Sequence, residues 1–445
     1  MFRFQFLGKT KIPHRKNTAS LSPVRMPAPK EVCITMDQHL GAPAAPVVAV
    51  GDEVRVGQLI AEATGFVSAP IYASVSGKVT KIDSLLRANG AIVTAIRIES
   101  DGLMTPVEGI APPEITDAES LVAAIRTCGL VGLGGAGFPT AVKLEALKTG
   151  KINTLVINAA ECEPYLTVDA RTMLDDSQSV VEGIALLCRV APAIGRVIIG
   201  IEDNKPDCIA QMKRVFADNK TVSVASLPSR YPQGAEKILI RNTTGLTVPE
   251  GKLPADVGVL VLNVTTVAAI AAYAKSGMPL VEKCVTVDGS AIAEPKNVIA
   301  PIGTPIADII EFAGGLRCEA GKIILGGPMT GRAIYSTDEP ITKSSSGILA
   351  FSEKEAAGRT PTACLHCGKC LDACPNSLNV PAFSHALKNG DKSERAAILD
   401  ENRINLCVEC GACAFVCPAN RPLVENIRVA KQFLKEHKAH EATLK

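Results

Sequence analysis

Cysteines near the end of the 445-residue chain have a spacing that is typical of iron–sulfur binding. The pattern Cys-x2-Cys-x2-Cys-x3-Cys-Pro starts at Cys364 and is repeated from Cys407. In such a doubled motif, the fourth cysteine of each run binds the cluster that is held by the other run. We therefore expect two [4Fe–4S] clusters, one bound by Cys364, Cys367, Cys370 and Cys417, and the other by Cys407, Cys410, Cys413 and Cys374.

Zinc is the alternative metal, since thiolates also bind it tetrahedrally, but zinc ribbons use two Cys-x2-Cys pairs rather than this longer motif. His366 lies inside the first loop, where the thiolates already complete both sites, so we interpret it as a surface residue. We recognise no secretory signal at the start of the sequence, and we expect metal in a reducing compartment rather than disulfides. Because the clusters carry single electrons, the chain should contain another redox group.

A glycine-rich stretch from Gly129 to Thr140 is the second chemical signal. Backbone without Cβ atoms can approach a flat or phosphorylated ligand, and Pro139 is suited to begin a helix whose N-terminus favours an anion. A helix rather than a strand is expected before the loop, and the sequence lacks Gly-Lys-Ser/Thr, which argues against a Rossmann motif and a P-loop. The candidate contacts are Gly132, Gly134, Gly135, Gly137 and, on the following helix, Lys143.

An acidic turn, Asn158-Ala-Ala-Glu161-Cys162-Glu163-Pro164, follows the next expected strand. Sheets of α/β proteins usually bind ligands at this position. Because carboxylates repel phosphate, they would face another part of a ligand, such as a ribityl chain, a ribose or a ring N–H. A helix cap after a strand is the alternative without a ligand. Cys162 could be redox-active, although an isolated cysteine is usually a small buried hydrophobe.

The composition limits the classes of protein to which the chain can belong. Its length suits about three domains. With 47 Lys and Arg against 45 Asp and Glu, the net charge of +2 creates no overall field that would attract nucleic acid or anionic lipid. The longest uncharged stretch, residues 257–274, contains polar residues and divides into a strand and a helix, so we expect no transmembrane segment.

Local signals place several elements. Thr116 with Glu119 predicts a capping box, and Gly129 stands where a glycine commonly follows a helix. Thr304 with Pro305 predicts another helix start. Apolar runs predict strands at residues 154–157, 196–200 and 257–262.

The residue pattern changes along the chain and suggests a division into domains. Short Val- and Ile-rich strands indicate a barrel or sandwich, and helical periods that alternate with apolar runs indicate an α/β domain. The expected segments are an N-terminal arm (1–30), a β barrel or sandwich (31–100), an α/β domain (101–282), a compact βαβ-like unit (283–345), the cysteine-rich segment (346–425) and a basic amphipathic tail (426–445).

Two of these motifs resemble the FMN- and NADH-binding fold of the flavoprotein subunit of respiratory complex I. They are the stretch from Gly134 to Thr140 and the acidic turn, whose counterpart in that family is Asn-Ala-Asp-Glu-Ser-Glu-Pro. Here Ala160 and Cys162 replace the Asp and the Ser.

Two further motifs extend this resemblance. Tyr231-Pro-Gln-Gly234-Ala-Glu236 is similar to the family's Tyr-x-x-Gly-Glu-Glu turn, with Ala235 in place of the first acid. The segment from Leu262 to Thr266 is similar to its Asn-Asn-Val-Glu-Thr. The cofactor contacts that the resemblance implies, besides those of the glycine loop, are Asn158, Glu161, Glu163, Tyr231, Gly234, Glu236, Asn263 and Thr266, with Glu163 and Glu236 on the nicotinamide side.

The order of the segments resembles the RnfC proteins of Rnf complexes, which are membrane ferredoxin:NAD⁺ oxidoreductases coupled to ion transport. The resemblance implies a multidomain α/β chain with a β barrel-sandwich hybrid, a complex I flavoprotein-like domain, a β-grasp unit similar to soluble-ligand-binding domains, and a ferredoxin-like helical segment. It implies FMN, two [4Fe–4S] clusters and NAD(H) as substrate. A hydride would pass between NAD(H) and FMN, and single electrons between the clusters and the membrane subunits.

The resemblance also implies a place in the cell and partners. The chain would be peripheral, on the cytoplasmic face of the cell membrane, with the membrane subunits and a ferredoxin-type subunit as partners. No acid, base or nucleophile is assigned, because hydride transfer to flavin does not require one.

Two other functions remain open from the sequence. One is a cobalamin-reductase-like flavoprotein, which shares the glycine loop and the cluster motifs. The other is a non-enzymatic electron-relay adaptor that has lost nicotinamide binding, as Ala160 and Ala235 suggest. The barrel lacks a lysine at the usual carrier position, so we expect a docking platform rather than a swinging arm, and we expect the turn at Gly326–Met329 to be structural.

Overall fold

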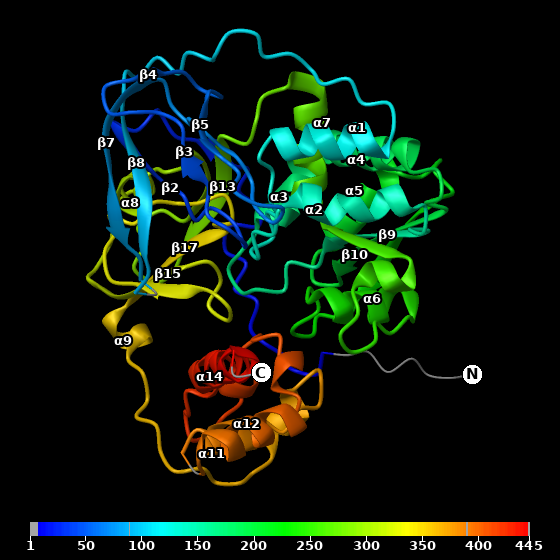
Figure 1. Cartoon of the computed structure of the whole chain (residues 1–445), viewed down its shortest axis with the longest axis vertical. Helices are drawn as coiled ribbons and strands as arrows, with labels where there is room; N and C mark the ends of the chain where they lie inside the picture. Colours follow the sequence, from blue (N-terminus) through cyan, green and yellow to red (C-terminus); the bar gives the residue numbers. More distant parts are fainter. Residues whose placement is uncertain (1–7, 89, 389, 444–445) are drawn as a thin grey trace.

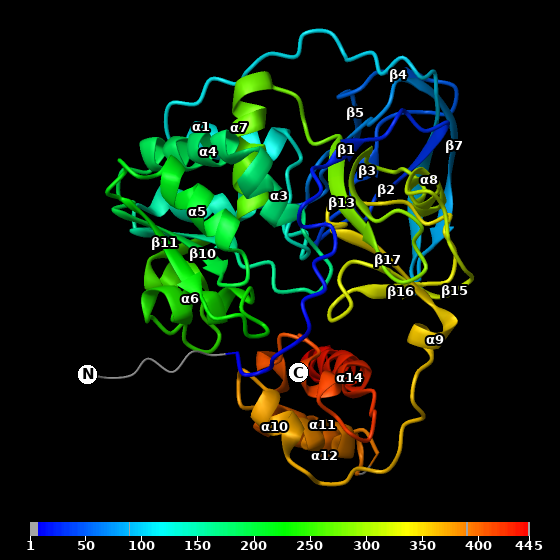
Figure 2. The ribbon, with the colours of Figure 1, turned by 180° about the vertical axis from the view of Figure 1, so that it is seen from behind.

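The computed structural model describes residues 8–88, 90–388 and 390–443. Two β-rich parts, coloured blue and yellow in Figure 1, lie next to a green part in which helices cover a sheet. A helical part, coloured orange and red, lies below them. The start of the chain runs from this helical part up between the other parts, as the view from behind shows (Figure 2).

Short antiparallel strands form the first β-rich part, as the spacing of its Val and Ile residues predicts. Val32, Ile60 and Ile98 are fully buried in its core. One sheet has the strand order β2-β8-β7-β4 and the other the order β3-β5-β6. The strands are β2 (Glu31–Thr35), β3 (Ala45–Pro46), β4 (Glu53–Val54), β5 (Leu59–Glu62), β6 (Ile71–Tyr72), β7 (Gly77–Leu86) and β8 (Ile92–Ser100).

A parallel sheet with the order β11-β10-β9-β12 forms the centre of the α/β domain. Its strands are apolar runs because both faces are covered. In β9, Leu155 and Ile157 face the larger core, whereas Val156 faces the core on the side of α6. The elements are α1 (Ala118–Thr127), α2 (Thr140–Leu144), β9 (Thr154–Ala159), α3 (Val168–Asp175), α4 (Ser177–Val190), β10 (Arg196–Glu202), α5 (Pro206–Val215), β11 (Val222–Leu227), α6 (Glu236–Thr244), β12 (Val259–Asn263) and α7 (Val264–Ser276).

Two predicted helix starts are wrong by one residue. The N-cap of α1 is Asp117, whose carboxylate accepts a hydrogen bond from Ser120 N at 2.8 Å, so Thr116 does not cap the helix. The N-cap before α8 is Pro305, while the Thr304 hydroxyl donates to Pro301 O at 2.7 Å. Each side chain has a closer local partner than the capping rule assumes. Gly129 follows α1 with a φ of +66°, as predicted.

The second β-rich part is one mixed sheet with the order β1-β14-β13-β17-β15-β16. Strand β1 comes from the N-terminal arm and pairs with β14. Strand β17 pairs with β13 and β15, so the sheet extends beyond residue 345, where the sequence predicted its end. The elements are β1 (Val24–Arg25), β13 (Glu282–Asp288), β14 (Lys296–Pro301), α8 (Ile306–Phe312), β15 (Ala320–Leu325), β16 (Arg332–Ile334) and β17 (Gly347–Ser352).

The helical part packs around the two cysteine loops. Its last helix, α14, starts three residues before the predicted tail and turns Ile427, Ala430 and Leu434 into the core, which leaves Val429 59% exposed. Among the described helices, none combines the length and the apolar content needed to cross a membrane. The helices are α9 (Glu353–Ala356), α10 (Lys369–Ala373), α11 (Val380–Ala386), α12 (Lys392–Glu401), α13 (Ala412–Phe415) and α14 (Leu423–Thr443).

Lys343 joins three parts of the chain at a buried point between β16 and β17. Its side chain is fully buried, and Nζ donates to Pro70 O at 2.6 Å and to Gly129 O at 2.7 Å. Its backbone N–H donates to Gln38 Oε1 at 2.8 Å. Burial lowers the pKa of Lys343 to about 7. The barrel, the α/β domain and the linker are therefore held together by an amine that loses its charge easily.

We expect the stability that this joint contributes to rise with pH. An unfolded lysine has a pKa of about 10.4, so between about pH 7 and pH 10 the unfolded chain binds a proton that folded Lys343 does not, which favours the folded state as the pH rises. The melting temperature of the wild type minus that of Lys343→Met should increase over this range. The exposed Lys354, changed to Met, is the control and should show no such trend. A difference for Lys343→Met that is constant or decreases with pH contradicts this interpretation.

Candidate functional site

The carboxyl edge of the parallel sheet brings together several of the predicted cofactor residues. Asn158 lies at the end of β9, Asn263 ends β12 beside it, and Gly234 lies in the loop after β11. Asn158 Nδ2 donates to Gly234 O at 2.9 Å, and Asn263 Nδ2 lies 3.5 Å from Asn158 O. Since all four strands are parallel, their carboxyl ends meet at one edge, where ligands of such sheets bind.

The glycine loop lies over this edge, between α1 and α2. Leu133 N donates to Thr266 Oγ1 at 2.9 Å, which ties the loop to the start of α7. A Cβ on Gly134 would stand 2.9 Å from Asn263 Nδ2, while a Cβ on Gly135 would meet open space. Gly134 and Gly135 are exposed, so their backbone is accessible to a flat ligand, as FMN binding requires.

Two more observations bear on the fit of FMN to this loop. The hydroxyl of Thr140, at the start of α2, is buried and has no hydrogen-bond partner within the described part of the chain. A buried polar group of this kind is expected to find a partner when a ligand binds. Gly137 has a φ of +64°, and its carbonyl accepts a hydrogen bond from Leu40 N of the barrel at 3.0 Å. The residues present therefore fit a ligand that has a flat ring and a polar chain.

Lys283, which the sequence did not single out, holds the loop from the other side. Its Nζ, on β13, donates to Leu133 O at 3.0 Å, and the residue is 3% exposed. Burial lowers the pKa of Lys283 to about 8. The glycine loop is thus fixed by the barrel and by the mixed sheet as well as by its own domain.

Lys143 and Glu236, both predicted to contact a cofactor, are paired with each other. Their side chains form a hydrogen-bonded ion pair, and each is about one-third exposed (33% and 37%). The pair links α2 to the first turn of α6. A direct contact of either residue with a cofactor stays a prediction.

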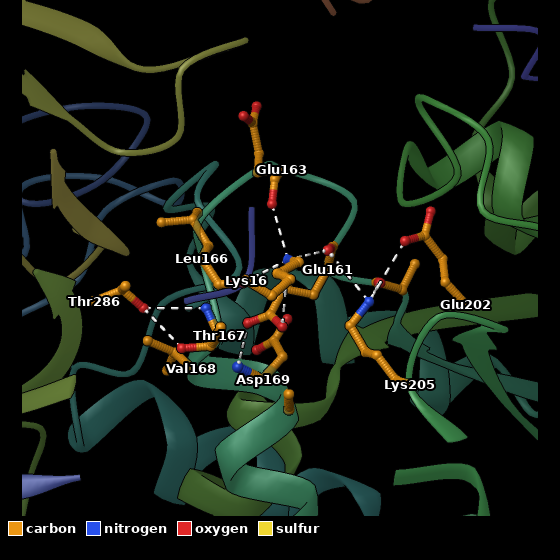
Figure 3. Close-up of polar contacts among 12 residues, drawn as sticks. Lys16, Glu161, Glu163, Leu166, Thr167, Val168, Asp169, Glu202, Lys205 and Thr286 are labelled. Atoms are coloured by element: carbon orange, nitrogen blue, oxygen red, sulfur yellow. Dashed lines mark hydrogen bonds and ion pairs between the residues drawn. The ribbon is translucent and has the colours of Figure 1, made fainter. Parts of the chain in front are cut away.

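The carboxylate of Glu161 turns into the protein at the base of the acidic turn (Figure 3). Oε1 accepts a hydrogen bond from Asp169 N at 2.7 Å, Oε2 lies 3.7 Å from Lys16 Nζ, and the side chain is 5% exposed. Burial raises the pKa of Glu161 to about 7, against the opposing charge of Lys16. Glu161 faces the start of α3 and the N-terminal arm, so its assignment as a direct flavin contact stays a prediction.

Glu163 faces the mixed sheet. Its carboxylate accepts hydrogen bonds from Met329 N at 3.0 Å and from the Thr330 hydroxyl at 2.5 Å, and burial raises its pKa. A Cβ on Gly327 would overlap this carboxylate. The turn at Gly326–Met329, predicted to be structural, therefore has the specific task of holding Glu163. Whether Glu163 also contacts a nicotinamide stays a prediction.

Tyr231 connects the acidic turn to the second cysteine loop. Its hydroxyl donates to Cys410 O at 2.6 Å and lies 3.5 Å from Glu163 Oε1, and the residue is 3% exposed. Ile12 of the arm and Ala412 pack against it. Next to it, burial raises the pKa of the Cys162 thiol to about 12, as expected for a small buried hydrophobe rather than a thiolate.

Two buried lysines beside the acidic turn were missed from the sequence. Lys205 Nζ donates to Ala160 O at 2.6 Å and lies 3.4 Å from Glu202 Oε2. Lys16 donates to carbonyls on the opposite side of the turn. A lysine followed by proline before a helix, and a basic arm, carry no pattern that links them to a turn more than 40 residues away in sequence.

The two cysteine loops have the same backbone conformation. Gly368 and Gly411 precede α10 and α13 with φ values of +75° and +79°, and His366 and Glu409 take φ values of +52° and +53°. In each loop, the backbone N–H two residues after the first cysteine donates to its sulfur, at 3.4 Å. Such N–H···S contacts help to set the reduction potential of a cluster.

The second proposed thiol set surrounds one hollow. The residues that line it include Cys374, Cys407, Cys410 and Cys413, with Leu378, Val380, Val424 and Ile427 among the apolar ones. Cys374 also acts electrostatically on Cys407, Cys410 and Cys413, while Cys364 and Cys417 act on Cys370. The thiols therefore lie in two groups that exchange the fourth cysteine, as the motif predicts.

This donor set of thiols fits two [4Fe–4S] clusters. Within residues 8–443, leaving aside 89 and 389, no group of three or more His, Cys, Asp or Glu side chains is arranged to hold a metal ion. The ligand assignment thus rests on the paired loops and the common hollow, and it stays a prediction.

Four family models match the chain in the predicted order. They are the RnfC barrel sandwich hybrid domain (residues 4–103), the Nuo51 FMN-binding domain (125–272), the SLBB domain (284–333) and the 4Fe-4S dicluster domain (361–421). The predicted fold class is therefore confirmed, as are FMN and [4Fe–4S] as the classes of cofactor.

A solved structure of an NAD⁺-reducing [NiFe]-hydrogenase in the H₂-reduced state is also similar. It has a TM-score of 0.48 and 18% sequence identity, over 73% of this chain and 65% of that chain.

Two curated relatives match over most of their length. Both are RnfC proteins of ferredoxin:NAD(+) oxidoreductase complexes. The relative from the proton-translocating complex of Clostridium ljungdahlii is 45% identical, over 83% of this chain and 81% of the relative. The relative from the Na(+)-translocating complex of Acetobacterium woodii is 42% identical, over 96% of both. With these matches and the geometry above, the chain belongs to the RnfC family of ion-translocating ferredoxin:NAD(+) oxidoreductase complexes.

Proposed function

We propose that the chain exchanges hydride between NAD(H) and an FMN held at the carboxyl edge of its parallel sheet, and conducts single electrons through two [4Fe–4S] clusters. A hydride carries two electrons and a cluster one, and flavin, when bound, supplies the conversion between them. The residues of the chain bind and orient the cofactors. In the ion-translocating complex, the electrons pass to or from the other subunits.

The contact between Tyr231 and Cys410 is the observation that carries this function. Its hydrogen bond of 2.6 Å joins the domain of the glycine loop to the loop of the second thiol set. Cys374 and Cys413 are buried, whereas Cys364 and Cys367 are exposed. This arrangement supports a path from the flavin edge through the second thiol set to the first, and from there to a partner.

The bound cofactor would be oriented by groups that already lie at the sheet edge. Backbone at Gly132, Gly134 and Gly135 would face the flat ring, and the side chains of Asn158 and Asn263 would supply hydrogen bonds. No residue is assigned a proton transfer, because hydride transfer to flavin does not demand one. Glu163 and Glu236 remain the candidates for the nicotinamide side.

The proposed function includes a place and partners in the cell. We assign the chain to the cytoplasmic face of the cell membrane as a peripheral subunit, in contact with the membrane subunits and a ferredoxin-type subunit. The barrel at residues 31–100 is proposed as a docking platform. The six segments predicted from the sequence remain our proposed domains, with the mixed sheet extended to Ser352 because β17 pairs within it.

An electron-relay adaptor without nicotinamide binding is the second candidate. One observation favours it, because both proposed nicotinamide contacts have protein partners: Thr330 donates to Glu163, and Lys143 pairs with Glu236. The names of the curated relatives, which include NAD(+), favour the first candidate, and they also favour it over a cobalamin reductase.

We expect NADH to bleach the flavin of the purified chain under anaerobic conditions. Hydride transfer removes the visible absorption of the oxidised flavin, which can be followed by titration with NADH. Glu163→Gln and Glu236→Gln should weaken the apparent NADH affinity about tenfold, the effect of losing one charged hydrogen bond. Flavin that is bound but not bleached by NADH would mean that the adaptor function is correct.

The exchange of the fourth cysteine predicts which pairs of cysteine variants lose one cluster and which lose both. Cys374→Ser combined with Cys413→Ser should retain about half of the iron, because both thiols belong to the same proposed cluster. Cys374→Ser combined with Cys370→Ser should lose nearly all of it. Iron analysis and EPR of the reduced chain measure this, with Cys318→Ser, outside both motifs, as the control. The opposite ranking of the two double variants would refute the assignment.

Removing the hydroxyl of Tyr231 should slow electron transfer from the flavin to the clusters. Tyr231→Phe loses the bond to Cys410 O, and the stopped-flow rate of cluster reduction should fall several-fold while the rate of flavin reduction by NADH is unchanged. Tyr335→Phe is the matched control, since that exposed tyrosine also donates to a backbone carbonyl, Leu86 O. Equal rates of cluster reduction in both variants would exclude a role for the Tyr231 contact.

A further inference from the structure

The ammonium group of Lys16, from the N-terminal arm, sits in a cradle formed by the acidic turn (Figure 3). Nζ donates to Glu161 O at 2.8 Å, to Glu163 O at 2.9 Å and to Leu166 O at 2.5 Å. The three N–H groups of a lysine are thus matched by three carbonyls. The carboxylate of Glu161 lies 3.7 Å away, and the Lys16 side chain is 14% exposed.

The turn that Lys16 occupies has an unfavourable backbone. Glu161 and Tyr165 take φ values of +45° and +68°, in the left-handed region that side chains other than those of Gly, Asn and Asp rarely adopt. Such conformations persist where the surroundings enforce them. Lys16 binds three carbonyls of this turn, and the next part of the arm helps, because His14 O accepts the hydrogen bond of Tyr165 N at 2.9 Å.

A chain of polar contacts leads from Lys16 to the glycine loop. Glu161 Oε1 accepts the hydrogen bond of Asp169 N at 2.7 Å. The carboxylate of Asp169 then accepts hydrogen bonds from Asn263 Nδ2 and Thr265 Oγ1, both at 2.8 Å. The amide of Asn263 is the group on which a Cβ at Gly134 would intrude. The orientation of Asn263 under the glycine loop therefore depends on Asp169, and the position of Asp169 depends on Glu161.

The charge of Glu161 makes this chain depend on Lys16. Oε2 of Glu161 is buried, and in the described residues it has no hydrogen-bond partner. Lys205, the other nearby cation, directs its Nζ to Ala160 O at 2.6 Å and lies against Glu202. Without Lys16, a buried carboxylate would lose its cation, and removal of one partner from a buried pair is costly because the other charge is left uncompensated.

We propose that Lys16 is a positioning residue of the flavin site, which holds the acidic turn and, through Glu161 and Asp169, orients Asn263 beneath the glycine loop. This inference rests on the proposed function, because it concerns the site at which FMN is proposed to bind. It gives the N-terminal arm a part in cofactor binding although the arm lies outside the flavin domain in sequence.

Lys16→Met in the full-length holo chain tests this proposal, with Lys11→Met, at an exposed position of the same arm, as the matched control. Release of FMN on dilution, followed by flavin fluorescence, gives the affinity. We expect Lys16→Met to weaken FMN binding about tenfold to a hundredfold, the effect of removing a charged partner from buried groups, and Lys11→Met to leave it unchanged. FMN affinity in Lys16→Met equal to that of the control overturns the proposal.

The double variant separates positioning from general loss of structure. In Lys16→Met with Glu161→Gln, the buried carboxylate is gone together with its cation, so FMN affinity should recover part of the loss. A double variant that binds FMN no better than Lys16→Met would contradict the route through Glu161. If Lys16→Met fails to accumulate as folded chain, Lys16→Gln against Lys11→Gln carries the same test with the same direction.

Amide hydrogen exchange provides a measurement that does not depend on flavin. Residues 160–169 should exchange faster in Lys16→Met than in the wild type, while the strands of the barrel should not change. Unchanged exchange in the turn would overturn the proposal even if FMN binding were altered. A wild-type chain that contained no flavin would instead refute the proposed function, and the exchange result would still report on the contact of Lys16 with the turn.

Discussion

The acidic turn after β9 buries two carboxylates, and a buried carboxylate is tolerated only where donors or cations compensate for lost water. Those partners come from distant parts of the chain. Lys16 lies in the N-terminal arm, Asp169 N on α3, and the groups that hold Glu163, Met329 N and Thr330, in the mixed sheet. Folding of this turn is therefore coupled to the docking of the other parts around it.

This coupling has a consequence for electron transfer, which is sensitive to distance and orientation. The same turn contacts Tyr231, and Tyr231 contacts Cys410, so the flavin edge and the second thiol set share a rigid, buried boundary. The N-terminal arm closes this boundary, since Ile12 packs against Tyr231 and Lys16 binds the turn. The arm, which has little regular structure of its own, acts as a brace between the part proposed to accept hydride and the part proposed to carry single electrons.

Features encoded by short-range patterns could be predicted from the sequence. The doubled cysteine motif, the glycine loop and the apolar strands β9, β10 and β12 each depend on neighbouring residues, and the resemblance to the complex I flavoprotein placed Asn158 and Asn263 at one site. The capping errors at Thr116 and Thr304 show the limit of such rules, because a neighbouring group offered each side chain a better partner.

Contacts between residues far apart in sequence could not be predicted from these patterns. Lys16 and Lys283 are lysines without a motif, and their burial follows from how the arm and the mixed sheet pack on the flavin domain. The pairing of Lys143 with Glu236, and the turn at Gly327 that receives Glu163, likewise depend on tertiary contacts. Most of the residues that orient the site therefore lie outside the motifs that identify it.

The central claim is that this chain converts the paired electrons of a hydride into single electrons on iron–sulfur clusters. Rapid freeze-quench EPR of the anaerobic holo chain mixed with NADH, together with the flavin absorption measured on the same timescale, tests it most directly. The account predicts that signals of reduced [4Fe–4S] clusters grow after the flavin absorption falls. Flavin reduction by NADH without any cluster signal, or cluster reduction that does not require bound flavin, would contradict it.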